Sequence, residues 1–159
     1  MNTEHKTNTD PEIRDLWQTP KEVFEYLNKD FNFICDVAAS AENALCDNYI
    51  SAEDNALDKD WSRVNWCNPP FSNIDPWVSK AIEQRKKGNT TVMLLPSDTS
   101  VKWFKKAFNS ASSVVFITGR LAFINADTKR KVNGNNKGSV LFMWLANDAF
   151  IDKSVRLID

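Results

Sequence analysis

Residues 64–71, with the sequence VNWCNPPF, predict a buried β-strand and a rigid exit from a sheet. The strand part is mostly apolar, which is typical of a strand covered on both faces. Pro69 and Pro70 hold φ at about −65° and donate no backbone hydrogen bond, so the chain leaves the sheet stiff and extended. The side-chain oxygen of Asn68 and the carbonyls of Asn68 and Pro69 can then converge beside the ring of Phe71. Such a set of acceptors suits a planar molecule that carries an NH₂ group.

Strands and helices alternate on both sides of this segment. Hydrophobic patterns predict strands at 31–37, 91–95, 113–117 and 138–146, a possible short strand at 48–50, and helices at 20–28, 75–88 and 100–109, with a helix or turn at 41–46. Thr19 is expected as the N-cap of the first helix, with Pro20 at its first position and Glu22 completing a capping box. Asp75 and Pro76 repeat this N-cap and proline pattern before the second helix.

This alternation predicts an α/β fold with a mostly parallel central sheet flanked by helices, because several strands are apolar throughout. We expect one domain over residues 15–159 and a flexible polar segment over residues 1–14, which lacks the apolar run of a signal peptide. No stretch approaches the length of a membrane span. Three cysteines, an odd number among apolar neighbours, favour reduced thiols and a cytoplasmic protein.

Composition excludes several kinds of chemistry. The sole histidine is His5 and there is no CxxC pair, which argues against a zinc site or a histidine-dependent nucleophile, so no metal is expected. The four glycines form neither GxGxxG nor GxxxxGK[ST], so nicotinamide and P-loop chemistry lack their usual phosphate cradle. The net charge of −1 provides no overall attraction to DNA, so nucleic-acid binding would need a local basic patch.

A second strand end carries an acid and small residues. Asp36 closes the first predicted strand, and Ala38 and Ser40 follow in a run that lets a ligand lie close to the backbone. Ligands of open α/β sheets bind beyond the carboxyl ends of the strands. The arrangement suits a cofactor with an amino-acid tail, a cation and a nucleoside but no phosphate, such as S-adenosylmethionine. An acid at this position is also common as a helix cap or a solvated turn residue.

Taken in order, these motifs resemble those of the phage-type DNA adenine-N6 methyltransferases, a compact branch of the S-adenosylmethionine-dependent amino-methyltransferases. The resemblance runs over roughly residues 15–146, and the order and spacing of its parts make it specific. Its parts are residues 17–20 (WQTP), 36–44 (DVAASAENA), 54–61 (DNALDKDW), 66–72 (WCNPPFS), 94–96 (LLP) and 119–123 (GRLAF). It implies a compact Rossmann-like methyltransferase fold and a protein of the cytoplasm of a bacterium or a phage-infected cell.

The resemblance also implies roles in cofactor binding. Thr19 and Pro20 would hold the methionine end of S-adenosylmethionine, and Asp36 would lie against its amino-acid portion. Asp54 is the candidate for contacts to the nucleoside, although a solvated loop acid is an equally good interpretation. The expected cofactor-binding residues are Trp17, Thr19, Pro20, Asp36, Ala38, Ser40, Asp54 and Asn68.

Catalysis is assigned to Asn68, Pro69, Pro70 and Phe71. The exocyclic nitrogen of adenine is a poor nucleophile because its lone pair is delocalised into the ring. Acceptors from Asn68 and the Pro69 carbonyl would hydrogen-bond its hydrogens and favour a pyramidal nitrogen. Phe71 would stack on the base once it has been flipped out of the duplex. Positioning and electrostatics then account for transfer, without a metal or a covalent intermediate.

DNA contacts are expected from Ser72 and from a basic loop at 125–137. The candidate cations are Arg120, Lys129, Arg130 and Lys131. A charge run is also typical of a solvated face. Because no separate recognition domain is visible, a homodimer is possible.

Three alternatives stay open. The same acceptors would serve a cytosine-N4 methyltransferase, and a glutamine amide in a protein substrate is an equally planar NH₂ group. The chain could also be a non-catalytic DNA- or protein-binding module of the same fold.

Overall fold

In a computed structural model, residues 15, 17–132, 137–146 and 154–159 are described, and they form a seven-stranded sheet with strand order β2-β1-β3-β4-β6-β5-β7. The strands are β1 (Cys35–Asp36), β2 (Asn48–Tyr49), β3 (Val64–Cys67), β4 (Thr90–Pro96), β5 (Ser113–Ile117), β6 (Ser139–Trp144) and β7 (Ser154–Ile158). The helices are α2 (Lys21–Phe31), α3 (Asp75–Lys86) and α4 (Lys102–Ser110), with a 3₁₀ turn, η1 (Ala56–Asp58). The flexible segment expected at residues 1–14 lies outside the described residues.

Parallel pairing dominates the sheet. β2, β1, β3 and β4 lie parallel side by side, and β7 is parallel to β5. Only β6, among the described strands, runs antiparallel to its neighbours, β4 and β5. The α/β fold predicted from the sequence is confirmed.

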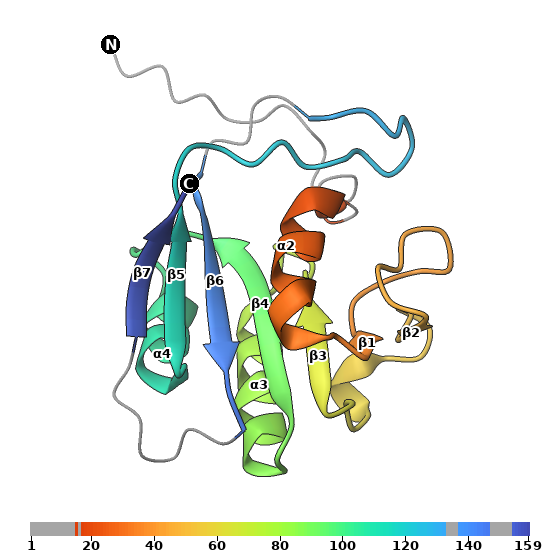
Figure 1. The fold of residues 1–159 in the computed structure, drawn as a ribbon. Coiled ribbons are helices and arrows are strands. Elements are labelled where there is room, and N and C mark those ends of the chain that lie inside the picture. Colours follow the sequence, from red (N-terminus) through yellow and green to blue (C-terminus); the bar gives the residue numbers. More distant parts are fainter. Residues whose placement is uncertain (1–14, 16, 133–136, 147–153) are drawn as a thin grey trace.

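Helices cover both faces of the sheet. In Figure 1, α2 lies on one face and α3 and α4 lie on the other. Alternate residues of β4 serve the two faces: Met93 and Leu95 belong to the core beneath α3 and α4, whereas Val92 and Leu94 belong to the core beneath α2. Both cores are apolar, which explains why these strands read as continuous hydrophobic runs.

The beginnings of the helices differ from the sequence prediction. α2 starts at Lys21 with Pro20 as its N-cap and has no side-chain cap hydrogen bond, so the predicted N-cap role of Thr19 and the capping box with Glu22 were wrong. Thr19 is instead 7% exposed, with its side chain directed to the cavity described below. α3 likewise includes Asp75 and takes Ile74 as its N-cap.

The end of α2 also lies later than predicted. The helix continues to Phe31, where Asn32 adopts a left-handed conformation (φ 51°) and Asn28 Oδ1 accepts a 2.7 Å hydrogen bond from the Phe33 backbone. The first strand is therefore shorter than predicted, and only Cys35–Asp36 pair with neighbours. Strand β7 was not predicted, because its residues are largely exposed and it depends on pairing with β5.

The strand order places the two sequence motifs side by side. The chain moves from β1 to β2 in one direction, then crosses back to β3 on the other side of β1. The order therefore reverses between β1 and β3, and ligands of open α/β sheets bind at such a switch point. Asp36 pairs in register with Trp66, two residues before Asn68.

Candidate active site

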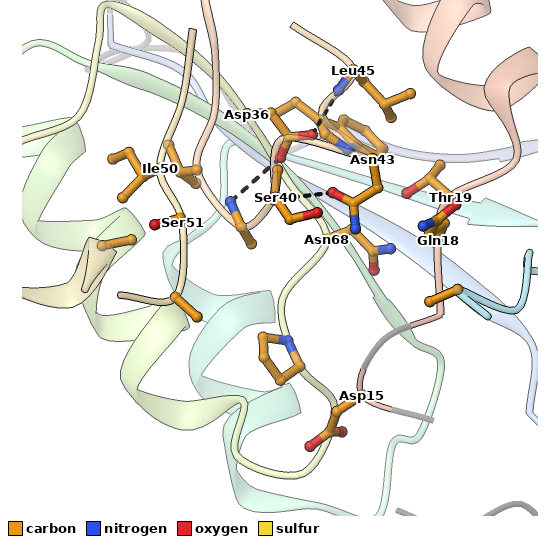
Figure 2. A pocket seen from close by; sticks show the side chains of 18 of the residues that line it. Asp15, Gln18, Thr19, Asp36, Ser40, Asn43, Leu45, Ile50, Ser51 and Asn68 are labelled. Atoms are coloured by element: carbon orange, nitrogen blue, oxygen red, sulfur yellow. Dashed lines mark hydrogen bonds between the residues drawn. The ribbon is translucent and has the colours of Figure 1, made fainter. Parts of the chain in front are cut away.

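A cavity of about 570 Å³ opens at this switch point. Figure 2 shows its wall, with Asp36, Ser40 and Asn43 facing Asn68 and the segment that carries Gln18 and Thr19. The loop after β2 and part of the loop before β6 complete the lining. The volume lies within the roughly 300–1,000 Å³ typical of small-molecule and cofactor sites.

Asp36 is the buried charge of the cavity. Its side chain is 4% exposed, and its carboxylate accepts hydrogen bonds from the backbone N–H groups of Leu45 (3.1 Å) and Ala38 (3.4 Å). Burial raises the pKa of Asp36 to about 6, while these two hydrogen bonds act in the opposite direction. A cationic group of a ligand beside Asp36 would favour the ionised form.

The loop after β1 presents small residues to the cavity. Asn43 Oδ1 accepts a 2.7 Å hydrogen bond from the Ser40 backbone, and the Ala44 N–H donates to the Ser40 carbonyl. Ala38 and Ser40 line the cavity, as expected for cofactor-binding residues. With no bulky side chain at these positions, a ligand can approach the backbone closely.

Asn68 has a fixed amide and open acceptors. Its Nδ2 donates to the Trp17 carbonyl at 3.3 Å, which sets the orientation of the amide group. Within the described residues, no donor reaches Asn68 Oδ1 or the carbonyl oxygens of Asn68 and Pro69. Asn68 and Pro70 line the cavity, whereas Pro69 is buried beside it. Asn68 Oδ1 is thus an acceptor without a described protein donor on a residue of the cavity wall, while the catalytic roles expected of Asn68 and Pro69 stay predictions.

Phe71 belongs to an aromatic cluster next to the cavity. Its ring meets Phe123 edge-on with centroids 6.0 Å apart, and Phe123 in turn stacks on Trp17 at 6.0 Å. Phe71 is half-buried and does not line the cavity. Trp17 does line it, and its indole N–H is buried without a partner in the described part of the protein.

Two expected cofactor residues lie outside the cavity wall, Pro20 and Asp54. Asp54 accepts hydrogen bonds from Ser51 Oγ (2.9 Å) and Lys59 Nζ (3.2 Å) on the exposed surface, and both lower its pKa. Cavity-lining residues that sequence reasoning missed include Asp15, Gln18, Glu42, Asn43, Glu53 and Asn55. Glu42 and Asn43 fall within the quoted motif after Asp36, which was the available signal.

The expected DNA contacts divide into two groups. All five residues are exposed, and Lys129 differs from the other four, Ser72, Arg120, Arg130 and Lys131, in forming part of the cavity wall. The Ser72 backbone N–H donates to Asp15 Oδ1 at 3.0 Å.

The cysteines are free thiols. Cys35 and Cys67 are buried, and burial raises the pKa of Cys67 well above its usual value. Among the described residues, no group of histidine, cysteine and acidic side chains is arranged to hold a metal ion, and no helix is long and apolar enough to cross a membrane.

Fold and cavity together define an α/β protein with a cofactor-type site at the switch point of its sheet. Residues 6–154 match the family described as DNA N-6-adenine-methyltransferase (Dam), and the chain belongs to this family. It is 42% identical over 155 residues to a DNA N-6-adenine-methyltransferase of Escherichia phage T1, covering 86% of this chain and 65% of that protein. It is also 42% identical over 144 residues to a protein of the same name from Haemophilus phage HP1, covering 87% and 83% of the two chains.

These matches confirm the family that the motifs had indicated, the DNA N-6-adenine-methyltransferases. The chain spans about two thirds of the length of the phage T1 relative.

Proposed function

We propose that this protein transfers a methyl group from S-adenosylmethionine to the exocyclic amine of a flipped adenine in DNA. The observation that carries the proposal is the pairing of two adjacent strand ends in one cavity. One end supplies the buried carboxylate of Asp36, and the other supplies the open acceptors of Asn68 and Pro69.

The cavity residues fit this cofactor. Asp15, Asp36, Glu42 and Glu53 place carboxylates on the wall, which suits a ligand with cationic groups and disfavours one with phosphates. The buried indole N–H of Trp17 offers a hydrogen bond that no described protein group accepts. When bound, S-adenosylmethionine supplies a methyl group on a positively charged sulfonium.

The protein's own residues then position the amine. Trp17 holds the amide of Asn68 through its carbonyl, so Asn68 Oδ1 faces the incoming N–H group. The Pro69 carbonyl accepts the second hydrogen, and the rigid prolines keep the two acceptors at a constant separation. Phe71, which lies outside the cavity wall and meets Phe123 edge-on, is the proposed stacking partner of the base.

Exposed cations are proposed to hold the DNA backbone. Arg120, Arg130 and Lys131 are the candidates, with Ser72 close to the catalytic loop in sequence. A homodimer, which would present two such surfaces to one duplex, also remains a proposal. The cytoplasm of the host cell is the compartment in which DNA and S-adenosylmethionine are both available.

The test is transfer of radiolabel from S-adenosylmethionine to unmethylated DNA, with the product base identified by mass spectrometry. We expect N6-methyladenine. N4-methylcytosine would instead support a cytosine-N4 methyltransferase. Label in the glutamine side chains of a protein substrate would support a protein glutamine methyltransferase. Absence of label together with absence of cofactor binding in calorimetry would reject an enzymatic role.

A further inference from the structure

Residues 124–131 form a hairpin that is attached to the cavity wall. The Gln18 N–H donates to the Ile124 carbonyl at 2.8 Å, and the Ile124 N–H donates back to Gln18 at 2.9 Å. Ile124 also bridges to Lys131 on the returning arm. Because Gln18 itself lines the cavity, these bonds place the hairpin at the rim.

The tip of the hairpin brings one exposed basic residue, Lys129, to the cavity wall. Asn125 Oδ1 accepts hydrogen bonds from the Asp127 and Thr128 backbones, and the Lys129 N–H donates to the Asn125 carbonyl at 2.9 Å. Lys129 has a left-handed backbone (φ 56°), which reverses the chain at this point. As a result Lys129 lines the cavity, whereas the next residue, Arg130, does not.

Lys129 is chemically unlike the rest of the wall. The described lining carries four carboxylates, and Lys129 is its one cationic side chain. Lys129 forms no ion pair within 4 Å among the described residues. It does attract Glu42, another lining residue: the pKa of Glu42 lies below its usual value, chiefly because Ser40 hydrogen-bonds to it and in smaller part because of Lys129.

The proposed cofactor brings one anionic group into this acidic cavity, the α-carboxylate of its amino-acid tail. Asp36 and Glu42 repel a carboxylate, and the main-chain donors at Ala38 and Leu45 already bond to Asp36. We infer that Lys129 binds the α-carboxylate of S-adenosylmethionine and so distinguishes the intact amino-acid tail from a tail that lacks this carboxylate. This assignment rests on the proposed function and moves Lys129 from DNA binding to cofactor recognition.

The experiment compares S-adenosylmethionine with its decarboxylated form, which lacks only the α-carboxylate, by isothermal titration calorimetry without DNA. Wild-type protein should prefer the intact cofactor by roughly 10- to 100-fold, the range of a charge-assisted hydrogen bond. Lys129→Met should abolish that preference and leave the affinity for the decarboxylated compound within about twofold. Lys131→Met, a matched change outside the cavity wall, should preserve the preference.

A second variant separates charge from backbone effects. Lys129→Gly removes the cation and relaxes the left-handed backbone, so it should lose the preference just as Lys129→Met does. The inference is overturned if either variant retains the wild-type preference. It is also overturned if a variant loses affinity for both compounds by the same factor. Failure of wild-type protein to bind either compound would reject the proposed function itself, which is a different result.

Discussion

Two neighbouring strand ends meet in the cavity, and their polar groups are used in opposite ways. At the end of β1, the carboxylate of Asp36 is buried and accepts hydrogen bonds from the backbone of its own loop. At the end of β3, Asn68 uses only its donor, toward Trp17, and leaves its acceptor open. The carboxylate of Asp36 already has donors from the protein, whereas Asn68 Oδ1 has none among the described residues. The two should therefore respond differently to mutation.

The largest effect is expected for mutation of Asn68, at the end of β3. Asn68→Ala removes the side-chain acceptor for the amine and should lower methyl transfer by roughly 10³-fold, the scale known for lost transition-state hydrogen bonds. Cofactor affinity should stay within about threefold, since the carboxylate of Asp36 is untouched. Single-turnover transfer and calorimetry measure the two quantities.

A matched variant sharpens that result. Asn68→Asp keeps an acceptor but has no donor for the Trp17 carbonyl, so its activity should lie between those of wild type and Asn68→Ala. An active Asn68→Ala protein would remove Asn68 from the mechanism.

The next largest effect concerns Asp36, at the end of β1, and its contribution to the free energy of unfolding. Because the pKa of Asp36 is about 6 when folded and its ordinary value is 3.8, the folded state binds a proton that the unfolded state lacks between these pH values. Stability contributed by this residue is therefore lost as pH rises from about 4 to above 6. Asp36→Asn removes the cost of ionising a buried carboxyl. The difference in free energy of unfolding between this variant and wild type should therefore shift in favour of the variant, by up to roughly 3 kcal/mol, as the pH rises over that interval. Urea unfolding at several pH values measures this difference, and parallel pH profiles would contradict it.

The same carboxylate should govern cofactor binding. A cationic ligand favours ionised Asp36, so the affinity of wild-type protein for S-adenosylmethionine should fall as pH decreases through about 6. Asp36→Asn should bind roughly 10-fold more weakly at neutral pH and lose this pH dependence. Calorimetry over about pH 5–8 checks both statements. A wild-type affinity independent of pH would mean that no ligand cation lies near Asp36.

The smallest effect is expected outside both strand ends. Replacing Arg130 and Lys131 with alanine should weaken DNA binding and reduce the slope of log affinity against log salt by about 1.8 if each residue neutralises one phosphate. Lys102→Ala with Lys105→Ala, on the exposed face of α4, is the matched control and should leave the slope unchanged. An equal change in both double variants would point to net charge rather than to the hairpin.

Local sequence patterns were sufficient to predict several of the strands that position the site. Strands β3 and β5 lie where continuous apolar runs placed them, at Val64–Cys67 and Ser113–Ile117. Once two such strands are parallel neighbours, their carboxyl ends meet at one edge of the sheet. The sequence placed Asp36 and Asn68 at strand ends, whereas their proximity depends on the parallel pairing of β1 with β3, which only the structure shows.

Features that depend on distant contacts were not predictable in this way. The sequence around Thr19 reads as a good helix cap, yet this residue is drawn into the cavity wall. In the sequence, Lys129 reads as part of a solvated charge run. It reaches the cavity wall because its hairpin pairs with Gln18. Likewise β7 exists through its pairing with β5.

The extended residues Trp17 and Gln18 have a consequence for handling the protein. One short stretch before α2 holds the side-chain amide of Asn68 through the Trp17 carbonyl and anchors the hairpin through Gln18. It contributes no strand to the seven-stranded sheet. We therefore expect a protease cut or a truncation between Gln18 and Lys21 to inactivate the protein while most of its secondary structure survives, so circular dichroism alone would be a poor measure of intact enzyme.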